Sequence, residues 1–230
     1  MTHIYWLEQS AGDVPAADDW LGAEEAVCLA GLRFPKRRAE WRLGRWTGKQ
    51  AVAALLGLGP PRESLAEIQI RAAASGAPEV FLAGRAAEIS ISLSHRAGRG
   101  LAAVTDTGAA PGCDLEVIEP RSAAFVEDYF TSEEQDLVRR APAAEHDRLV
   151  ALVWSAKESV LKALRTGLRA STRSVSVHPR GSLTAGGWQA FRAHAAGTVF
   201  EGWGAECRTL VRTLAVAPGC PRAHSLTTID

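Results

Sequence analysis

The sequence predicts an α+β protein made of two similar halves. The chain has 230 residues, 47% hydrophobic and 23% charged, which is an ordinary composition for a globular protein. Residues 46–52 (WTGKQAV) return as residues 154–160 (WSAKESV), and both copies lie inside helical patterns. Residues 89–94 (ISISLS) alternate with the period of a strand. A repeat at nearly half the chain length indicates a duplicated unit, which divides the chain into residues 1–107 and 108–230.

The individual elements follow from the same patterns. Helices are predicted at 36–57, 131–140 and 146–166, and strands at 89–94, 100–105, 112–118, 173–178 and 207–217. The first long helix has apolar residues at helical spacing and ends at glycine. The middle helix begins with a capping box, in which Thr131 is followed three residues later by Glu134. Residues 60–85 are predicted to be loop-rich.

Charge and cysteine content narrow the class of protein. The net charge is zero, so the whole molecule has no field that would attract a polyanion. The four cysteines form no C-x-x-C pair and have no histidine at zinc-finger spacing, which favours a reducing cytoplasm. The N-terminus has no signal-peptide pattern, and no apolar run is long enough to span a membrane. We therefore expect a cytoplasmic protein with no membrane or nucleic-acid partner.

The two copies of the repeat differ at two positions that are charged in the second copy and uncharged in the first. Gln50 stands where the second copy has Glu158, and Ala54 stands where it has Lys162. One explanation is an amphipathic surface helix, in which Glu158 and Lys162 form an exposed i,i+4 ion pair of about 0.2–0.5 kcal/mol. The other is chemistry in the second half alone. Trp46 and Trp154 are interpreted as core residues in both cases.

Two further carboxylates precede this helix. In the strand GCDLEVI, the period of two places Asp114 and Glu116 on the same face, where they repel each other. The face is either a solvated edge or a site for a hard divalent cation such as Mg²⁺. Glu158 is able to join them around one metal, and Lys162, one helical turn further on, points toward the same pocket.

Four ordered motifs resemble one family. GCDLE, WSAKESVLK, RFPKRRAEWRLGRW and SLSHRAG are similar to the signatures of the 4′-phosphopantetheinyl transferases. The length and the repeat resemble the larger class, which is monomeric and has two α/β subdomains related by a pseudo-twofold with the active site between them. This resemblance implies transfer of the phosphopantetheine arm of coenzyme A to a serine of an apo acyl or peptidyl carrier protein. The second product is adenosine 3′,5′-bisphosphate.

The resemblance also implies roles for individual residues. The metal ligands, for Mg²⁺ or Mn²⁺, are Asp114, Glu116 and Glu158. The residues that contact coenzyme A are Arg37, Arg45, Ser94, His95 and Lys162. The catalytic pair is Glu158, as the base for the carrier serine, and Lys162, which neutralises or protonates the leaving oxygen.

The sequence departs from the family at Ala77, where many members have a lysine near coenzyme A. Arg85 is one substitute. Two rival functions stay open. A metal-dependent nuclease would use the same carboxylates and the basic helix. A non-catalytic binding module would be a decayed duplicate, although Glu158 and Lys162 are both present. The kind of carrier protein is not predicted.

Overall fold

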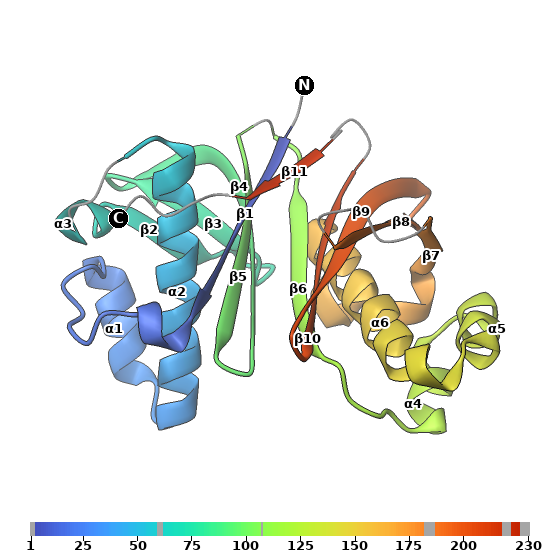
Figure 1. Ribbon diagram of the computed structural model, residues 1–230. Coiled ribbons are helices and arrows are strands. Elements are labelled where there is room, and N and C mark those ends of the chain that lie inside the picture. The colour runs from blue at the N-terminus through green and yellow to red at the C-terminus, as the bar shows by residue number, and fades with distance from the viewer. Residues whose placement is uncertain (1–2, 59–61, 107, 182–186, 218–221, 226–230) are drawn as a thin grey trace. The chain divides into compact units, whose positions relative to one another are not determined.

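The computed structural model describes residues 3–58, 62–106, 108–181, 187–217 and 222–225, which form two compact units (Figure 1). The first contains the described residues within Met1–Ala110 and Pro221–Asp230, and the second those within Pro111–Cys220. The structure differs from the predicted division at the C-terminal end. Strand β11 (Arg222–Ser225) belongs to the first unit, because it pairs in parallel with β1 (His3–Ser10). Strand pairing over such a long sequence separation leaves no local pattern.

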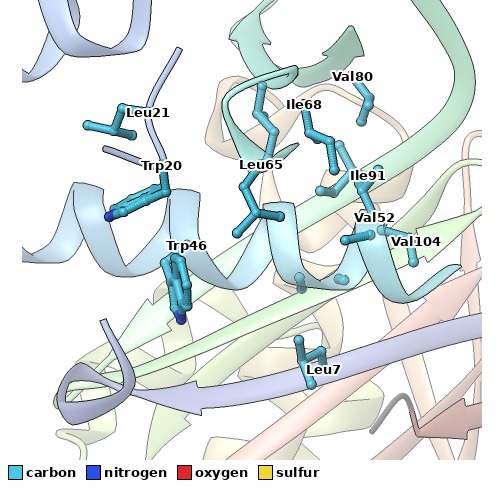
Figure 2. Close-up of a cluster of buried hydrophobic side chains, with 14 of the residues drawn as sticks. Leu7, Trp20, Leu21, Trp46, Val52, Leu65, Ile68, Val80, Ile91 and Val104 are labelled. Carbon is cyan, nitrogen blue, oxygen red and sulfur yellow. The ribbon is translucent and has the colours of Figure 1, made fainter. Parts of the chain in front are cut away.

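The first unit is a sheet with one long helix across it. The strand order is β11-β1-β5-β4-β3-β2. The remaining strands are β2 (Ile68–Ala72), β3 (Pro78–Leu82), β4 (Arg85–Arg96) and β5 (Arg99–Thr105). The helices are α1 (Ala23–Gly31), α2 (Pro35–Leu55) and the short α3 (Arg62–Leu65). Trp46 and Val52 of α2 pack into the core with Leu7 of β1 and Ile91 of β4 (Figure 2).

The second unit has a five-stranded antiparallel sheet in the order β6-β10-β9-β8-β7. Its strands are β6 (Pro111–Val117), β7 (Ser176–Arg180), β8 (Trp188–Ala195), β9 (Thr198–Cys207) and β10 (Leu210–Val216). Its helices are α4 (Ala123–Tyr129), α5 (Ser132–Arg140) and α6 (His146–Ala163). The predicted capping box is confirmed, since the Thr131 hydroxyl accepts from the Glu134 backbone N–H while Glu134 accepts from the Thr131 backbone N–H.

The two units repeat one topology. Each begins with a strand, continues through helices, and ends in a four-stranded meander whose last strand pairs with the first. The helical repeat fixes the equivalent residues of the two long helices, in which Gln50 matches Glu158 and Ala54 matches Lys162.

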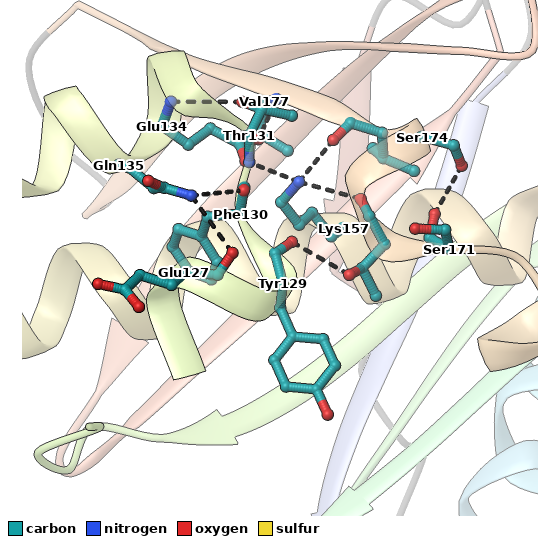
Figure 3. Close-up of polar contacts among 12 residues, drawn as sticks. Glu127, Tyr129, Phe130, Thr131, Glu134, Gln135, Lys157, Ser171, Ser174 and Val177 are labelled. Carbon is teal, nitrogen blue, oxygen red and sulfur yellow. Dashed lines mark hydrogen bonds and ion pairs between the residues drawn. The ribbon is translucent and has the colours of Figure 1, made fainter. Parts of the chain in front are cut away.

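A buried ion pair is also duplicated. In the first unit, Lys49 lies 2.5 Å from Glu25, whose carboxylate also accepts from the backbone N–H groups of Gly22 and Ile70. In the second unit, Lys157 lies 2.7 Å from Glu134 (Figure 3). Each pair ties the long helix to the shorter helix before it and to the first strand of the meander. The duplication predicted from seven residues therefore extends through the fold.

Several elements were not predicted. The stretch expected to be loop-rich contains β2 and β3, and α1, β1, β8 and β9 had no counterpart in the sequence analysis. The α+β class is confirmed, with sheets in both units. Within the described part of the chain, no helix is both long enough and apolar enough to cross a membrane.

Candidate active site

The charged residues of the second repeat gather where α6 crosses β6. Trp154, Glu158 and Lys162 follow one another at intervals of four residues and share one face of α6. The Lys162 ammonium donates to Oδ1 of Asp114 at 2.8 Å and to the carbonyl oxygen of Cys113 at 3.0 Å. Glu158 is only 9% exposed. The contact between Lys162 and a buried carboxylate excludes the simple surface helix that the sequence left open.

Two local features bring the helix so close to the strand. A Cβ at Gly112 would lie 1.7 Å from the carbonyl oxygen of Ser159, so only glycine fits between β6 and α6. The hydroxyls of Ser155 and Ser159 lie 2.8 Å and 2.7 Å from the Thr213 hydroxyl on β10. Thr213 is the register partner of Asp114. These contacts fix the distance of α6 from the sheet and the rotation of α6 about its axis, and so place its side chains beside the carboxylates of β6.

Burial and neighbouring charge shift two pKa values in the site. The pKa of Glu158 rises to about 7, first because burial penalises its charged form and then because Asp114 repels it. Lys162 opposes this shift, and Glu116 adds to it. Burial has the largest single effect and would lower the pKa of Lys162, but Asp114, Cys113 and Glu158 together outweigh it and the pKa is raised. Lys162 therefore stays protonated at neutral pH, while Glu158 exchanges its proton there.

Glu116 is held by two other donors. The Trp154 indole Nε1 donates to its Oε1 at 3.0 Å, and Arg121 Nη2 donates to its Oε2 at 3.3 Å. Arg121 also pairs with Glu119 at 3.0 Å and lies over the Phe125 ring. Sequence reasoning missed Arg121, which lies outside the motifs, and treated Trp154 as a core residue only. The tryptophan does pack against the core, but its polar edge faces the carboxylate.

The carboxylate oxygens of Asp114, Glu116 and Glu158 suit a hard divalent cation, although they are not arranged as a metal-binding site in this structure. Among the described residues, no three His, Cys, Asp or Glu side chains are grouped closely enough to hold a metal. Two of the carboxylates are instead paired with the chain's own cations, Asp114 with Lys162 and Glu116 with Arg121. Glu158 Oε1 is buried and accepts no hydrogen bond from any described residue. A cation beside it would relieve both that deficit and the mutual repulsion that raises its pKa.

The first unit carries the other residues that the sequence singled out. Ser94 is buried on β4, and His95 follows it on the opposite face, where its ring lies near Gly44 of α2. Arg45 is the residue after Gly44. Its Nε lies 3.9 Å from Glu25, and its guanidinium lies 4.9 Å from the centre of the Trp41 ring. Burial lowers the pKa of Arg45, opposed by Glu25.

Arg37 is exposed about two helical turns before Arg45, so the structure separates these two predicted coenzyme A contacts along α2. Other cations of the basic run have structural roles. Arg38 donates to the carbonyl oxygens of Leu29 and Leu32, while Arg42 donates to that of Pro15 and pairs with Asp18 at 2.8 Å. The high charge density of the run therefore overstates how much of it is available to a ligand.

Comparisons with known proteins agree with this geometry. A family model described as the 4′-phosphopantetheinyl transferase superfamily matches residues 110–197, which include β6 and α6. The 4′-phosphopantetheinyl transferase HetI of Nostoc sp. is 27% identical over 166 residues, covering 70% of this chain and 67% of that protein. These two similarities support a 4′-phosphopantetheinyl transferase enzyme, and the family match lies within residues 110–197.

Solved structures with detectable similarity include two holo-(acyl-carrier-protein) synthases. The one from Bacillus anthracis, in complex with CoA (3′,5′-ADP), is 23% identical with a TM-score of 0.38, over 44% of this chain and 92% of that one. The one from Thermotoga maritima is 21% identical with a TM-score of 0.36, over 46% of this chain and 61% of that one.

Proposed function

We propose that the protein transfers the 4′-phosphopantetheine arm of coenzyme A to a serine of an apo acyl or peptidyl carrier protein and releases adenosine 3′,5′-bisphosphate. The observation that carries this proposal is the cluster of Asp114, Glu116, Glu158 and Lys162 in the second unit. In the first unit, the helical repeat places the uncharged Gln50 and Ala54 where the second unit has Glu158 and Lys162. The charged pair of α6 therefore has an uncharged counterpart, although the surrounding packing is duplicated.

The reaction needs a base, a cation for the leaving group, and positioning. The serine oxygen forms a bond to the phosphorus that carries the pantetheine, and the bond from that phosphorus to the bridging oxygen breaks. Glu158, a buried carboxyl group one helical turn from Lys162, accepts the serine proton, directly or through water. Lys162 donates a charge-assisted hydrogen bond to the oxygen on which negative charge develops.

Asp114, Glu116 and Glu158 would hold Mg²⁺, and Mn²⁺ suits the same oxygen donors. When bound, the metal would supply Lewis-acid neutralisation of the pyrophosphate. In the first unit, Arg37, Arg45, Ser94 and His95 would bind the nucleotide end of coenzyme A, a function suited to charge-assisted donors. We also infer a monomer, because one chain carries both copies of the duplicated unit.

The test is the intact mass of an apo carrier protein after incubation with coenzyme A, Mg²⁺ and this protein. A gain of one phosphopantetheine group, lost with EDTA, is expected. Glu158→Gln, which makes the second copy of the repeat resemble the first at this position, should remove the gain while the fold is kept. The proposal would be rejected if fatty-acid, polyketide and peptide carriers all stayed unmodified and the protein also failed to bind coenzyme A. Cleavage of DNA with Mg²⁺ in the same preparation would favour the nuclease.

A further inference from the structure

Trp154 contacts the candidate metal site through one polar atom. Its indole Nε1 donates to Oε1 of Glu116 at 3.0 Å, across from the helix α6 to the strand β6. Glu116 is on the same face of β6 as Asp114, whereas Trp154 is on the same face of α6 as Glu158. We propose that Trp154 is a positioning residue, whose indole N–H fixes the orientation of the Glu116 carboxylate toward the cation. This inference rests on the proposed function, because it concerns the metal of that reaction.

The indole is itself held in place by two aromatic rings. Phe125 and Tyr129 of α4 lie 5.0 Å and 5.2 Å from the Trp154 ring, both in edge-to-face geometry. Such packing restricts the ring to one orientation. The rotation of Trp154 therefore depends on α4, and the direction of its N–H is set before any ligand arrives. A donor fixed in this way selects one rotamer of Glu116.

The duplicated unit shows what this tryptophan does when no carboxylate is present. Trp46 occupies the equivalent position of α2, is 6% exposed, and packs 5.2 Å from Trp20. Its Nε1 is buried and donates to no described residue. Packing is thus common to both tryptophans, and the hydrogen bond belongs only to the unit with the carboxylates.

Fixing a ligand through a neighbouring donor has a known consequence for affinity. A group that hydrogen-bonds a metal ligand sets its direction, and its loss typically weakens metal binding by about 10–100-fold. A carboxylate that rotates freely must instead be ordered when the metal binds. Removing the indole N–H should therefore lower the free energy of Mg²⁺ binding by more than it lowers the free energy of unfolding.

The experiment compares Trp154→Phe with Trp46→Phe, a matched control in which the same substitution is made at the equivalent core position. Mg²⁺ is titrated calorimetrically into each full-length protein in the presence of coenzyme A, and urea unfolding is measured without Mg²⁺. We expect Trp154→Phe to weaken Mg²⁺ binding about tenfold or more, whereas Trp46→Phe leaves it within about twofold of wild type. The free energy of unfolding should fall in both variants, because phenylalanine is smaller than tryptophan and fills less of the packed core.

A second measurement needs no stable variant. The indole N–H signal of Trp154 in ¹H–¹⁵N spectra of the wild-type protein should shift on adding Mg²⁺, while that of Trp46 stays fixed. Equal Mg²⁺ affinity in the two variants, or an unmoved Trp154 signal while Mg²⁺ binds, would overturn the positioning role and leave the proposed function intact. Wild-type protein that transfers no phosphopantetheine and binds no Mg²⁺ would overturn both.

Discussion

Lys157 lies 2.7 Å from the Glu134 carboxylate, on a different side of α6 from its sequence neighbour Glu158. Its ammonium also donates to the carbonyl oxygens of Thr172 and Val175 (Figure 3). Burial lowers the pKa of Lys157, an effect that Glu134 opposes. Lys49 and Glu25 make the same arrangement in the unit without the carboxylate cluster. The K-E pair of the motif therefore joins a structural lysine to a candidate catalytic glutamate.

This arrangement predicts that Lys157→Met and Lys49→Met lower stability to a similar degree. Each removes one partner of a fully buried pair and leaves a carboxylate without its counter-charge, which typically costs about 3–5 kcal/mol. Urea unfolding at pH 7 measures the loss. Lys36→Met is the surface control, because its pair with Glu40 is long and exposed and should contribute less than about 1 kcal/mol. Normal stability with lost turnover in Lys157→Met would assign Lys157 to the chemistry instead.

Glu158 should make the stability of the metal-free protein fall as the pH rises. Its folded-state pKa of about 7 lies above the ordinary value of 4.5, so the native protein holds this proton more tightly than the unfolded chain. The stabilising contribution is full below pH 4.5 and is lost by about pH 7. At most about 3.5 kcal/mol is involved, since a pKa difference of one corresponds to about 1.4 kcal/mol.

Glu158→Gln has no such proton and should be more stable than wild type at pH 8, with the difference vanishing near pH 4.5. Thermal unfolding across this range in EDTA checks the sign. Glu145→Gln, at an exposed carboxylate just before α6, is the control and should follow the wild-type curve. Parallel curves for wild type and Glu158→Gln would show that Glu158 is not destabilised by its neighbours.

Strong local patterns in the sequence were sufficient for part of this fold. The long helices, the capping box at Thr131, and the strands β5 and β6 lie close to their predicted bounds, because helical spacing, a cap and turn residues act over short distances. Strands β8 and β9 were missed. Arg192 and Glu201 do fit a period of two, but several of the buried positions that alternate with them hold small residues, such as Ala193 and Gly202, so the hydrophobic signal is weak.

The same limit applies to the site. The spacing of Glu158 and Lys162 on one helix face, and of Asp114 and Glu116 on one strand face, is visible in the sequence. The contacts that join those faces are not visible in the sequence. Thr213 lies far along the chain from its partner Ser155, and Arg121, the partner of Glu116, lies outside any motif. Gly112 belongs to a quoted motif, but the closeness of Ser159 that requires a glycine is evident only from the structure.

Gly112→Ala should damage both the fold and the site. The added methyl group would overlap the Ser159 carbonyl, so α6 must move away from β6 and Lys162 from Asp114. We expect a loss of about 1–3 kcal/mol or more, as for other overpacked cores, together with loss of turnover. Gly31→Ala is the control, since nothing lies within 4 Å of a Cβ there and alanine favours a helix. Wild-type stability and turnover in Gly112→Ala would contradict the close packing.

Lys162→Ala separates charge in the site from packing. Lys162 lowers the pKa of Glu158, so its removal should raise that pKa further and move the pH at which metal-free stability falls to a higher value. Turnover should fall about ten- to over a hundredfold, the expected loss for one charge-assisted contact felt in the transition state. Lys162→Arg keeps the positive charge and should preserve the wild-type pH dependence, although its planar guanidinium need not restore the rate. An unchanged rate in Lys162→Ala would leave the lysine as a counter-charge for Asp114 alone, because the contact at 2.8 Å would then serve the resting protein and not the reaction.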